Sequence, residues 1–87
     1  MKRALLLLLL APAVASAQPT GDKVDAQSLM KSGVKLLEGK DYLGALAIFK
    51  NAYDRFPSAK ILLNIGTTLK LLGRDADAAN IYQRYLD

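Results

Sequence analysis

The chain has 87 residues, a formal net charge of +4, and neither cysteine nor histidine. This length allows one small domain at most. Without cysteine and histidine, the chain has no disulfides, thiolate metal sites or histidine-based acid–base catalysis. Lys2 and Arg3 carry two of the positive charges, so the rest of the chain is close to neutral. It lacks the concentrated basic face of a nucleic-acid-binding protein, and we expect no nucleic-acid partner.

Residues 1–17 resemble a cleavable signal peptide. A short cationic start precedes an apolar run, residues 4–15, which contains six consecutive leucines. The run is shorter than the roughly 20 residues that a helix needs to span a bilayer. Ala15 and Ala17 form the small-x-small pattern that a signal peptidase cleaves. We expect cleavage after Ala17, export to the periplasm or secretion, and a flexible linker over residues 18–25.

The rest of the chain shows helical periodicity throughout. Apolar residues recur at steps of three and four, which predicts four helices, and no segment alternates with the period of a strand. The first predicted helix starts near Asp22, and Gly39 ends it because glycine reaches the left-handed conformation without steric cost. Short connections require each helix to run antiparallel to its neighbour, so the predicted fold class is all-α. The predicted N-caps of the next three helices are Asp41, Ser58 and Asp75, and the predicted breaks are Pro57 and Gly73.

Similar residues recur along the chain at a fixed offset of 33 positions. Gly33 corresponds to Gly66, and Ala45 corresponds to Ala78. A fixed period near 34 residues that contains two helices is typical of a helical solenoid. The other matched pairs are Leu29 with Leu62, Leu36 with Leu69, Ile48 with Ile81, and Phe49 with Tyr82.

These two units resemble tetratricopeptide repeats. The resemblance covers residues 26–87 and implies two antiparallel helix–turn–helix repeats, 26–58 and 59–87, in a short right-handed solenoid. A generic four-helix bundle is the alternative that the pattern leaves open. The residues that carry the resemblance are Gly33, Leu36, Ala45, Phe49 and Pro57 in the first unit, and Gly66, Leu69, Ala78 and Tyr82 in the second.

The repeat pattern also predicts how the helices pack. The matched glycines and alanines are expected to bring paired helices into close contact, and Phe49 and Tyr82 to fill the space between successive hairpins. Pro57 is expected to fix the turn into the second unit. Three positions depart from the family pattern: Ser32 stands where leucine is usual, Tyr85 where alanine is usual, and Asp75 where an aromatic residue is usual.

The sequence offers little for catalysis. With histidine and cysteine absent, only carboxylates remain as catalytic groups. Asp75 and Asp77 are two residues apart, so they point to different faces of a helix, and an acidic first turn explains both. We expect no enzymatic activity, no catalytic residues, no metal, no cofactor and no small-molecule substrate.

The resemblance places the first helix of each hairpin on the concave face of the solenoid. It therefore implies a non-catalytic scaffold or adaptor of the cell envelope, which binds a protein or peptide segment in this groove. In members of the family that bind the carboxylate pair at the C-terminus of a peptide, a lysine and an asparagine stand at these positions. This chain has Met30 and Val34 there instead. The groove residues implied by position are Gln27, Met30, Lys31 and Val34 from the first unit, and Lys60, Leu63, Asn64, Thr67 and Lys70 from the second.

A second interpretation concerns the last predicted helix, which ends in Tyr82, Tyr85 and Leu86. An exposed apolar surface of this kind usually marks an interface. The alternative function is therefore a structural unit that associates with itself through this helix, or the N-terminal part of a longer repeat array.

Overall fold

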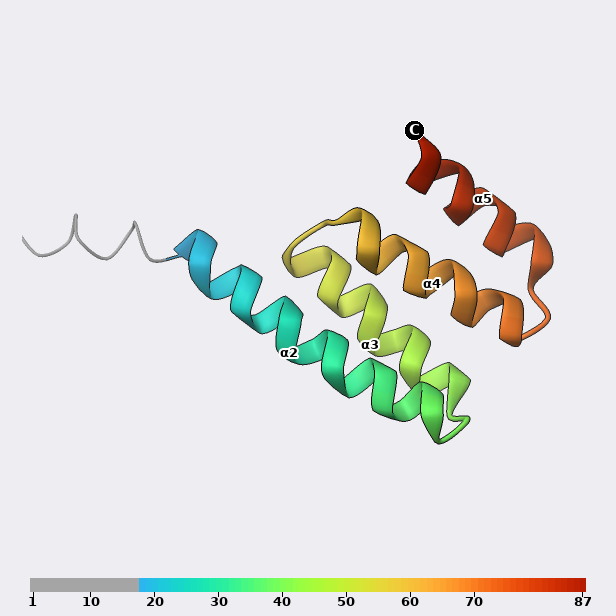
Figure 1. The fold of residues 1–87 in the computed structure, drawn as a ribbon, viewed down its shortest axis with the longest axis horizontal. Coiled ribbons are helices and arrows are strands. Elements are labelled where there is room, and N and C mark those ends of the chain that lie inside the picture. The colour runs from blue at the N-terminus through green and yellow to red at the C-terminus, as the bar shows by residue number, and fades with distance from the viewer. Residues whose placement is uncertain (1–17) are drawn as a thin grey trace, which may run out of the picture.

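A computed structural model describes residues 18–87, which form four helices and no strand, so the predicted all-α fold class is confirmed. In Figure 1 the helices follow one another in chain order, and each reverses the direction of the one before. None of the helices in this range is both long and apolar enough to cross a membrane. Their bounds are α2 (Gln18–Glu38), α3 (Tyr42–Arg55), α4 (Ala59–Leu71) and α5 (Asp75–Leu86).

Two of the three predicted N-caps are confirmed. The Asp41 carboxylate accepts a hydrogen bond from the Gly44 backbone N–H at 3.0 Å, at the start of α3. The Ser58 hydroxyl accepts one from the Ile61 N–H at 3.3 Å, at the start of α4. Each bond satisfies a backbone donor that has no partner within the helix.

The predicted cap at Asp75 is wrong by one residue. Arg74 occupies the N-cap position of α5 and makes no side-chain capping hydrogen bond. Asp75 and Asp77 instead lie in the first turn, where carboxylates interact favourably with the positive end of the helix dipole. The Arg74 guanidinium pairs with Asp77 at 2.8 Å, so its side chain is directed along the helix surface.

The first helix is longer than the periodicity suggested. Residues 18–25, the predicted flexible linker, lie within α2. Ala26 is 2% exposed, and the Asp25 carboxylate pairs with the Arg55 guanidinium of α3 at 2.8 Å. The ion pair attaches this part of α2 to α3, and Ala26 belongs to the buried core. The predicted signal peptide, residues 1–17, lies outside the described residues.

The turns within the two hairpins have the same backbone geometry, 33 residues apart. Lys40 and Gly73 both adopt a positive φ, 65° and 76° respectively. The next residue then closes the turn: the Asp41 N–H donates to the Leu36 carbonyl at 2.8 Å, and the Arg74 N–H to its equivalent, Leu69, at 2.9 Å. The left-handed residue after α2 is therefore Lys40, and not Gly39 as expected from sequence.

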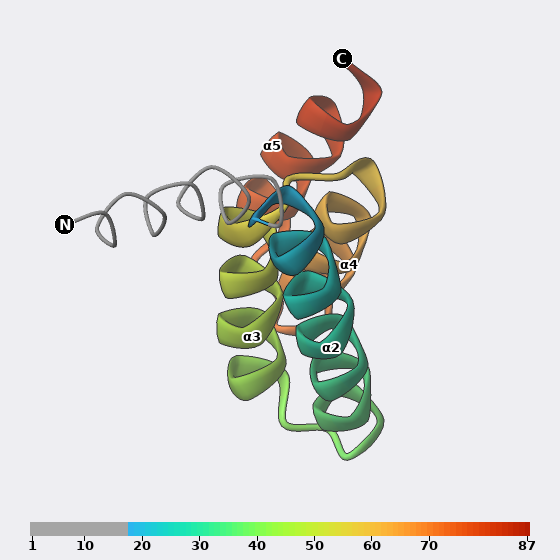
Figure 2. The ribbon, with the colours of Figure 1, turned by 90° about the vertical axis from the view of Figure 1, so that its left-hand side faces the viewer.

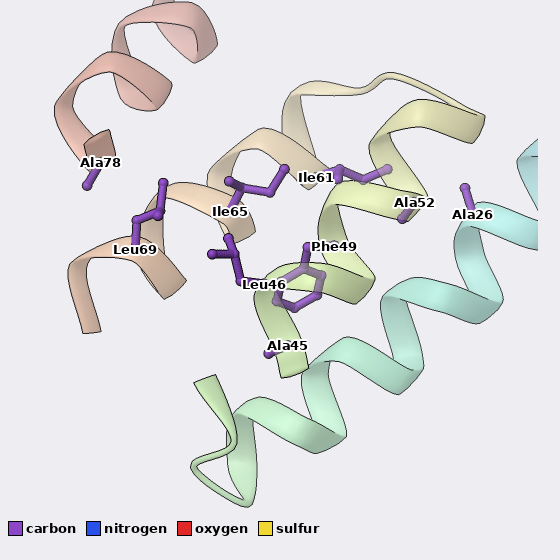
Figure 3. Close-up of a cluster of buried hydrophobic side chains, with 9 residues drawn as sticks. All are labelled: Ala26, Ala45, Leu46, Phe49, Ala52, Ile61, Ile65, Leu69 and Ala78. Atoms are coloured by element: carbon purple, nitrogen blue, oxygen red, sulfur yellow. The ribbon is translucent and has the colours of Figure 1, made fainter. Parts of the chain in front are cut away.

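The core runs through all four helices, and α3 contributes the largest share of it, four of nine residues (Figure 3). Both views of the ribbon show α2 beside α3 (Figures 1 and 2), and α4 also packs against α3. Helix α3 therefore packs against two helices. The buried cluster consists of Ala26, Ala45, Leu46, Phe49, Ala52, Ile61, Ile65, Leu69 and Ala78.

Each hairpin packs an aromatic ring onto a glycine of its first helix. A Cβ atom at Gly33 would lie within 3.0 Å of Phe49 ring carbons, and a Cβ atom at Gly66 would meet the Tyr82 ring at 2.5 Å. The glycines therefore let the paired helices approach closely. Both rings lie against the glycine of their own hairpin, whereas the sequence had suggested the space between hairpins. Phe49 also joins the cluster shared with α4.

Candidate binding groove

A groove of ≈ 1040 Å³ runs along α2, past the loop over residues 56–58, and onto the first turns of α4. Its floor is apolar and its edges carry charged side chains. Among the lining residues, Ala26 and Ile61 are buried, at 2% and 3% exposure, and Met30 is half-buried. The apolar residues that line the groove are Val24, Ala26, Met30, Val34, Phe56 and Ile61.

One face of α2 forms a complete wall of the groove. Val24, Gln27, Lys31, Val34 and Glu38 all line it, and they follow one another at alternating steps of three and four residues. This spacing places them on a single stripe of a helix. The straight run of α2 therefore sets the length of the groove.

Positive charge predominates at the groove edges. Four lysines line it, and Glu38 is the one acidic side chain among the lining residues. All four ammonium groups belong to exposed residues, so they are accessible to a ligand. Lys23 Nζ also lies 6.0 Å from the centre of the Phe56 ring, at the end of the groove where α2 meets the loop. The four lysines are Lys23, Lys31, Lys35 and Lys60.

The two hairpins meet inside the groove at Met30 and Asn64. The Asn64 side-chain Nδ2 lies 3.9 Å from the Met30 sulfur, and it also donates to the Lys60 carbonyl oxygen at 3.3 Å. The amide therefore lies across the junction of the two units. A ligand in the groove would contact both hairpins at once.

The structure brings together six of the nine groove residues expected from sequence. The lining residues among them are Gln27, Met30, Lys31, Val34, Lys60 and Asn64. The other three do not line the groove: one lies between two lining residues of α4, and two lie further along that helix. They are Leu63, which is 41% exposed, Thr67, whose hydroxyl lies 3.4 Å from the Tyr82 hydroxyl, and Lys70, which is exposed.

Nine further residues that the sequence did not predict line the groove. Two of them, Lys23 and Val24, fall within the predicted linker, residues 18–25, so the helical stripe was not expected to reach them. The spacing of Val24, Gln27 and Lys31 is a usable signal for this longer stripe. The nine residues are Lys23, Val24, Ala26, Ser28, Lys35, Glu38, Phe56, Ser58 and Ile61.

The residues that could bind a metal ion were compared across the part of the chain that the structure describes. Within residues 18–87 no three acidic, histidine or cysteine side chains gather in a way that could hold a metal ion. Comparison of the chain with models of known protein families, with curated proteins and with solved structures finds no match. The interpretation of the groove therefore depends on the geometry of this chain alone.

Proposed function

We propose that residues 26–87 form two tetratricopeptide-like repeats, and that the protein is a non-catalytic interaction module which binds a segment of another protein in its groove. The observation that carries this proposal is the groove itself, with its apolar floor and lysine edges. Recognition of an extended or helical peptide in a groove needs an apolar surface for affinity and flanking charges for selectivity.

The charge of the groove indicates the chemistry of the partner. Four lysines against one glutamate favour a segment with acidic residues on either side of apolar ones. The apolar side chains of such a segment would pack on Met30 and Val34, and its carboxylates would approach Lys31 and Lys60. Because these lysines are exposed, the electrostatic part of the binding should weaken as salt is added.

The geometry of the hairpins supports the repeat assignment. The same glycine-to-ring contact and the same left-handed turn recur 33 residues apart, although several of the residues differ. Agreement of this kind between units is expected of a repeat protein and has no reason to occur in an unrelated four-helix bundle.

Two labelled peptides test the function. Both carry the same leucines; one has glutamates and the other lysines at the remaining positions, and binding is followed by fluorescence anisotropy. We expect the glutamate peptide to bind about tenfold more tightly or better, which is the effect of about 1.4 kcal/mol. Equal binding of the two peptides would contradict the proposed partner.

A matched pair of lysine variants locates the binding surface. Lys31→Glu, inside the groove, should weaken the glutamate peptide about tenfold, because it replaces an attraction with a repulsion. Lys70→Glu changes the charge equally on an exposed lysine of α4 outside the groove, and should leave the affinity unchanged. Equal losses in both variants would show that net charge, and not the groove, attracts the peptide.

We further propose that the module acts outside the cytoplasm, as the signal-peptide pattern of residues 1–17 suggests. Expression of the full chain in a Gram-negative host tests this. Intact mass spectrometry should find a periplasmic product that begins at Gln18. Ala17→Phe should block cleavage, because a bulky side chain does not fit the small subsite of the peptidase.

A further inference from the structure

The thioether of Met30 lies in the groove, where the two hairpins meet. Its side chain is half-buried: it packs against the core cluster and also lines the groove. The Asn64 side-chain Nδ2, from the second hairpin, lies 3.9 Å from the Met30 sulfur. The sulfur is therefore held in a defined place and remains accessible to a small solute that enters the groove.

Met30 carries the one sulfur atom of residues 18–87. The full sequence has two methionines, Met1 and Met30, and neither cysteine nor tryptophan. Oxidants attack the sulfur of cysteine and methionine side chains, and the exposure of the sulfur sets how readily it reacts. An oxidant that reaches the described part of the chain therefore finds its sulfur in the groove and at no other place.

We propose that Met30 is a site of reversible oxidation that weakens binding in the groove, an inference that rests on the binding function proposed above. Hydrogen peroxide transfers one oxygen atom to the sulfur: its O–O bond breaks, an S–O bond forms, and the other oxygen leaves as water with both protons. The sulfur loses two electrons, and the peroxide gains them. The product, methionine sulfoxide, is polar, whereas the thioether is apolar.

The side-chain amide of Asn64 is placed to stabilise the oxidised form. Its Nδ2 donates to the Lys60 carbonyl oxygen at 3.3 Å and also lies beside the Met30 sulfur. Because the amide nitrogen carries two hydrogens, one can stay on the Lys60 carbonyl while the other donates to the sulfoxide oxygen. A thioether sulfur accepts a hydrogen bond only weakly. Oxidation therefore exchanges a weak acceptor for a strong one next to a donor that is already in place.

Oxidation changes the surface on which the apolar side chains of a bound segment pack. Met30 lies among the apolar lining residues, and the Asn64 amide supplies one hydrogen bond to the new oxygen. An apolar side chain packed over the sulfoxide would remove the rest of this polar group from water without a partner, which costs free energy. The lysines at the groove edges do not change, so the loss of affinity is partial.

The second hairpin supplies a matched control. At the offset of 33 the equivalent of Met30 is Leu63, whose side chain carries no sulfur. Leu63 is 41% exposed and does not line the groove. The double variant Met30→Leu/Leu63→Met therefore keeps the composition of the chain and moves its sulfur out of the groove.

The labelled glutamate peptide is titrated into the protein, expressed from its full sequence, before and after treatment with hydrogen peroxide. Peptide mapping by mass spectrometry should place one added oxygen on Met30, and circular dichroism should show that the oxidised protein is folded. We expect the affinity to fall about tenfold, and to return after treatment with methionine sulfoxide reductases and a dithiol. In NMR spectra the Asn64 side-chain amide signal should move on oxidation, while those of Asn51 and Asn80, on α3 and α5, should not.

Each variant is compared with itself before and after peroxide. Met30→Leu and the double variant should keep whatever affinity they have, because neither has a sulfur in the groove. The proposal is overturned if the fully oxidised protein binds as tightly as before, or if the double variant loses as much affinity. It is also overturned if Met30 reacts only once urea has unfolded the protein, or if oxidation itself unfolds it. No binding by the unoxidised protein would contradict the proposed function, and with it this control of binding.

Discussion

The two hairpins share their turns and their glycine-to-ring contact but differ sharply in burial. Helix α3 contributes four of the nine residues in the core cluster, whereas α5 contributes Ala78 alone. The aromatic residues show the same contrast: Phe49 is 0% exposed, and its equivalent Tyr82 is half-buried. Equivalent residues therefore differ in burial because α3 packs against two helices, α2 and α4, whereas α5 packs mainly against α4.

This difference in burial separates the contacts made within one hairpin from those that depend on the neighbouring hairpin. The contact of a ring with a glycine belongs to the hairpin, since both units make it. Enclosure of the ring belongs to the array, since it depends on the next helix. Substitutions at equivalent positions should therefore have unequal effects, and the size of the difference measures what the neighbouring helix contributes.

The largest difference is expected between Phe49→Ala and Tyr82→Ala. Loss of the fully buried Phe49 ring should lower the free energy of unfolding by about 3–5 kcal/mol, enough to unfold a domain of this size. Tyr82 loses only part of its surface to the hairpin, so its truncation should cost about 1–2 kcal/mol. Urea unfolding at a fixed protein concentration measures both. Equal losses would mean that α4 adds nothing to the environment of Phe49.

The next difference concerns the glycines beneath these rings. Gly33→Ala would place a methyl group against the enclosed Phe49 ring, and overpacking of this kind costs about 1–3 kcal/mol. The greater helical preference of alanine over glycine offsets about 1 kcal/mol of this cost, so we expect a net loss of stability of up to about 2 kcal/mol. In Gly66→Ala the half-buried Tyr82 ring is free to swing outward, so the same preference should leave stability nearly unchanged. Thermal melting of both variants against the unmodified protein decides between these outcomes.

Much of the fold could be predicted from the sequence because it depends on local signals. The steps of three and four, the polar caps at Asp41 and Ser58, and the offset of 33 are all readable without coordinates. The start of α2 was missed because Pro19 and Gly21 suggested a flexible segment, while the contact between Asp25 and Arg55 is distant in sequence. Contacts between residues that are distant in sequence produce no local sequence pattern from which they could be predicted.

The residues that line the groove could be predicted from the sequence only in part. Positions on the first helix of each unit identified Met30, Lys31 and Asn64 as lining residues. They did not show how far along α4 the groove extends, because that depends on where α2 and the loop over residues 56–58 lie in space. Lys70 was therefore included and Phe56 was omitted, although Phe56 lies at the end of the groove.

A smaller difference is expected between the helix caps at equivalent positions 41 and 74. Asp41→Ala removes the hydrogen bond to the Gly44 N–H and should cost about 1 kcal/mol. Arg74→Ala removes an exposed ion pair with Asp77 and no capping bond, so it should cost at most about 0.5 kcal/mol. Urea unfolding again gives both values. An equal or larger loss at Arg74 would mean that its pairing with Asp77 replaces the missing cap.

Effects of opposite sign are expected at the two left-handed turn residues. Lys40 adopts a φ of 65°, which costs a residue with a Cβ atom about 1–2 kcal/mol, while Gly73 adopts a φ of 76° at no such cost. Lys40→Gly should therefore stabilise the protein by about 0.5–1 kcal/mol, after the greater chain entropy of glycine in the unfolded state is subtracted. Gly73→Ala should destabilise it, although a Cβ atom there would meet nothing within 4 Å, so that backbone strain is the sole cause. Since the two turns share their hydrogen bonds, the double variant that exchanges the residue types should leave stability close to that of the unmodified protein. A loss of stability in Lys40→Gly would mean that the lysine side chain, and not the backbone, stabilises the first turn.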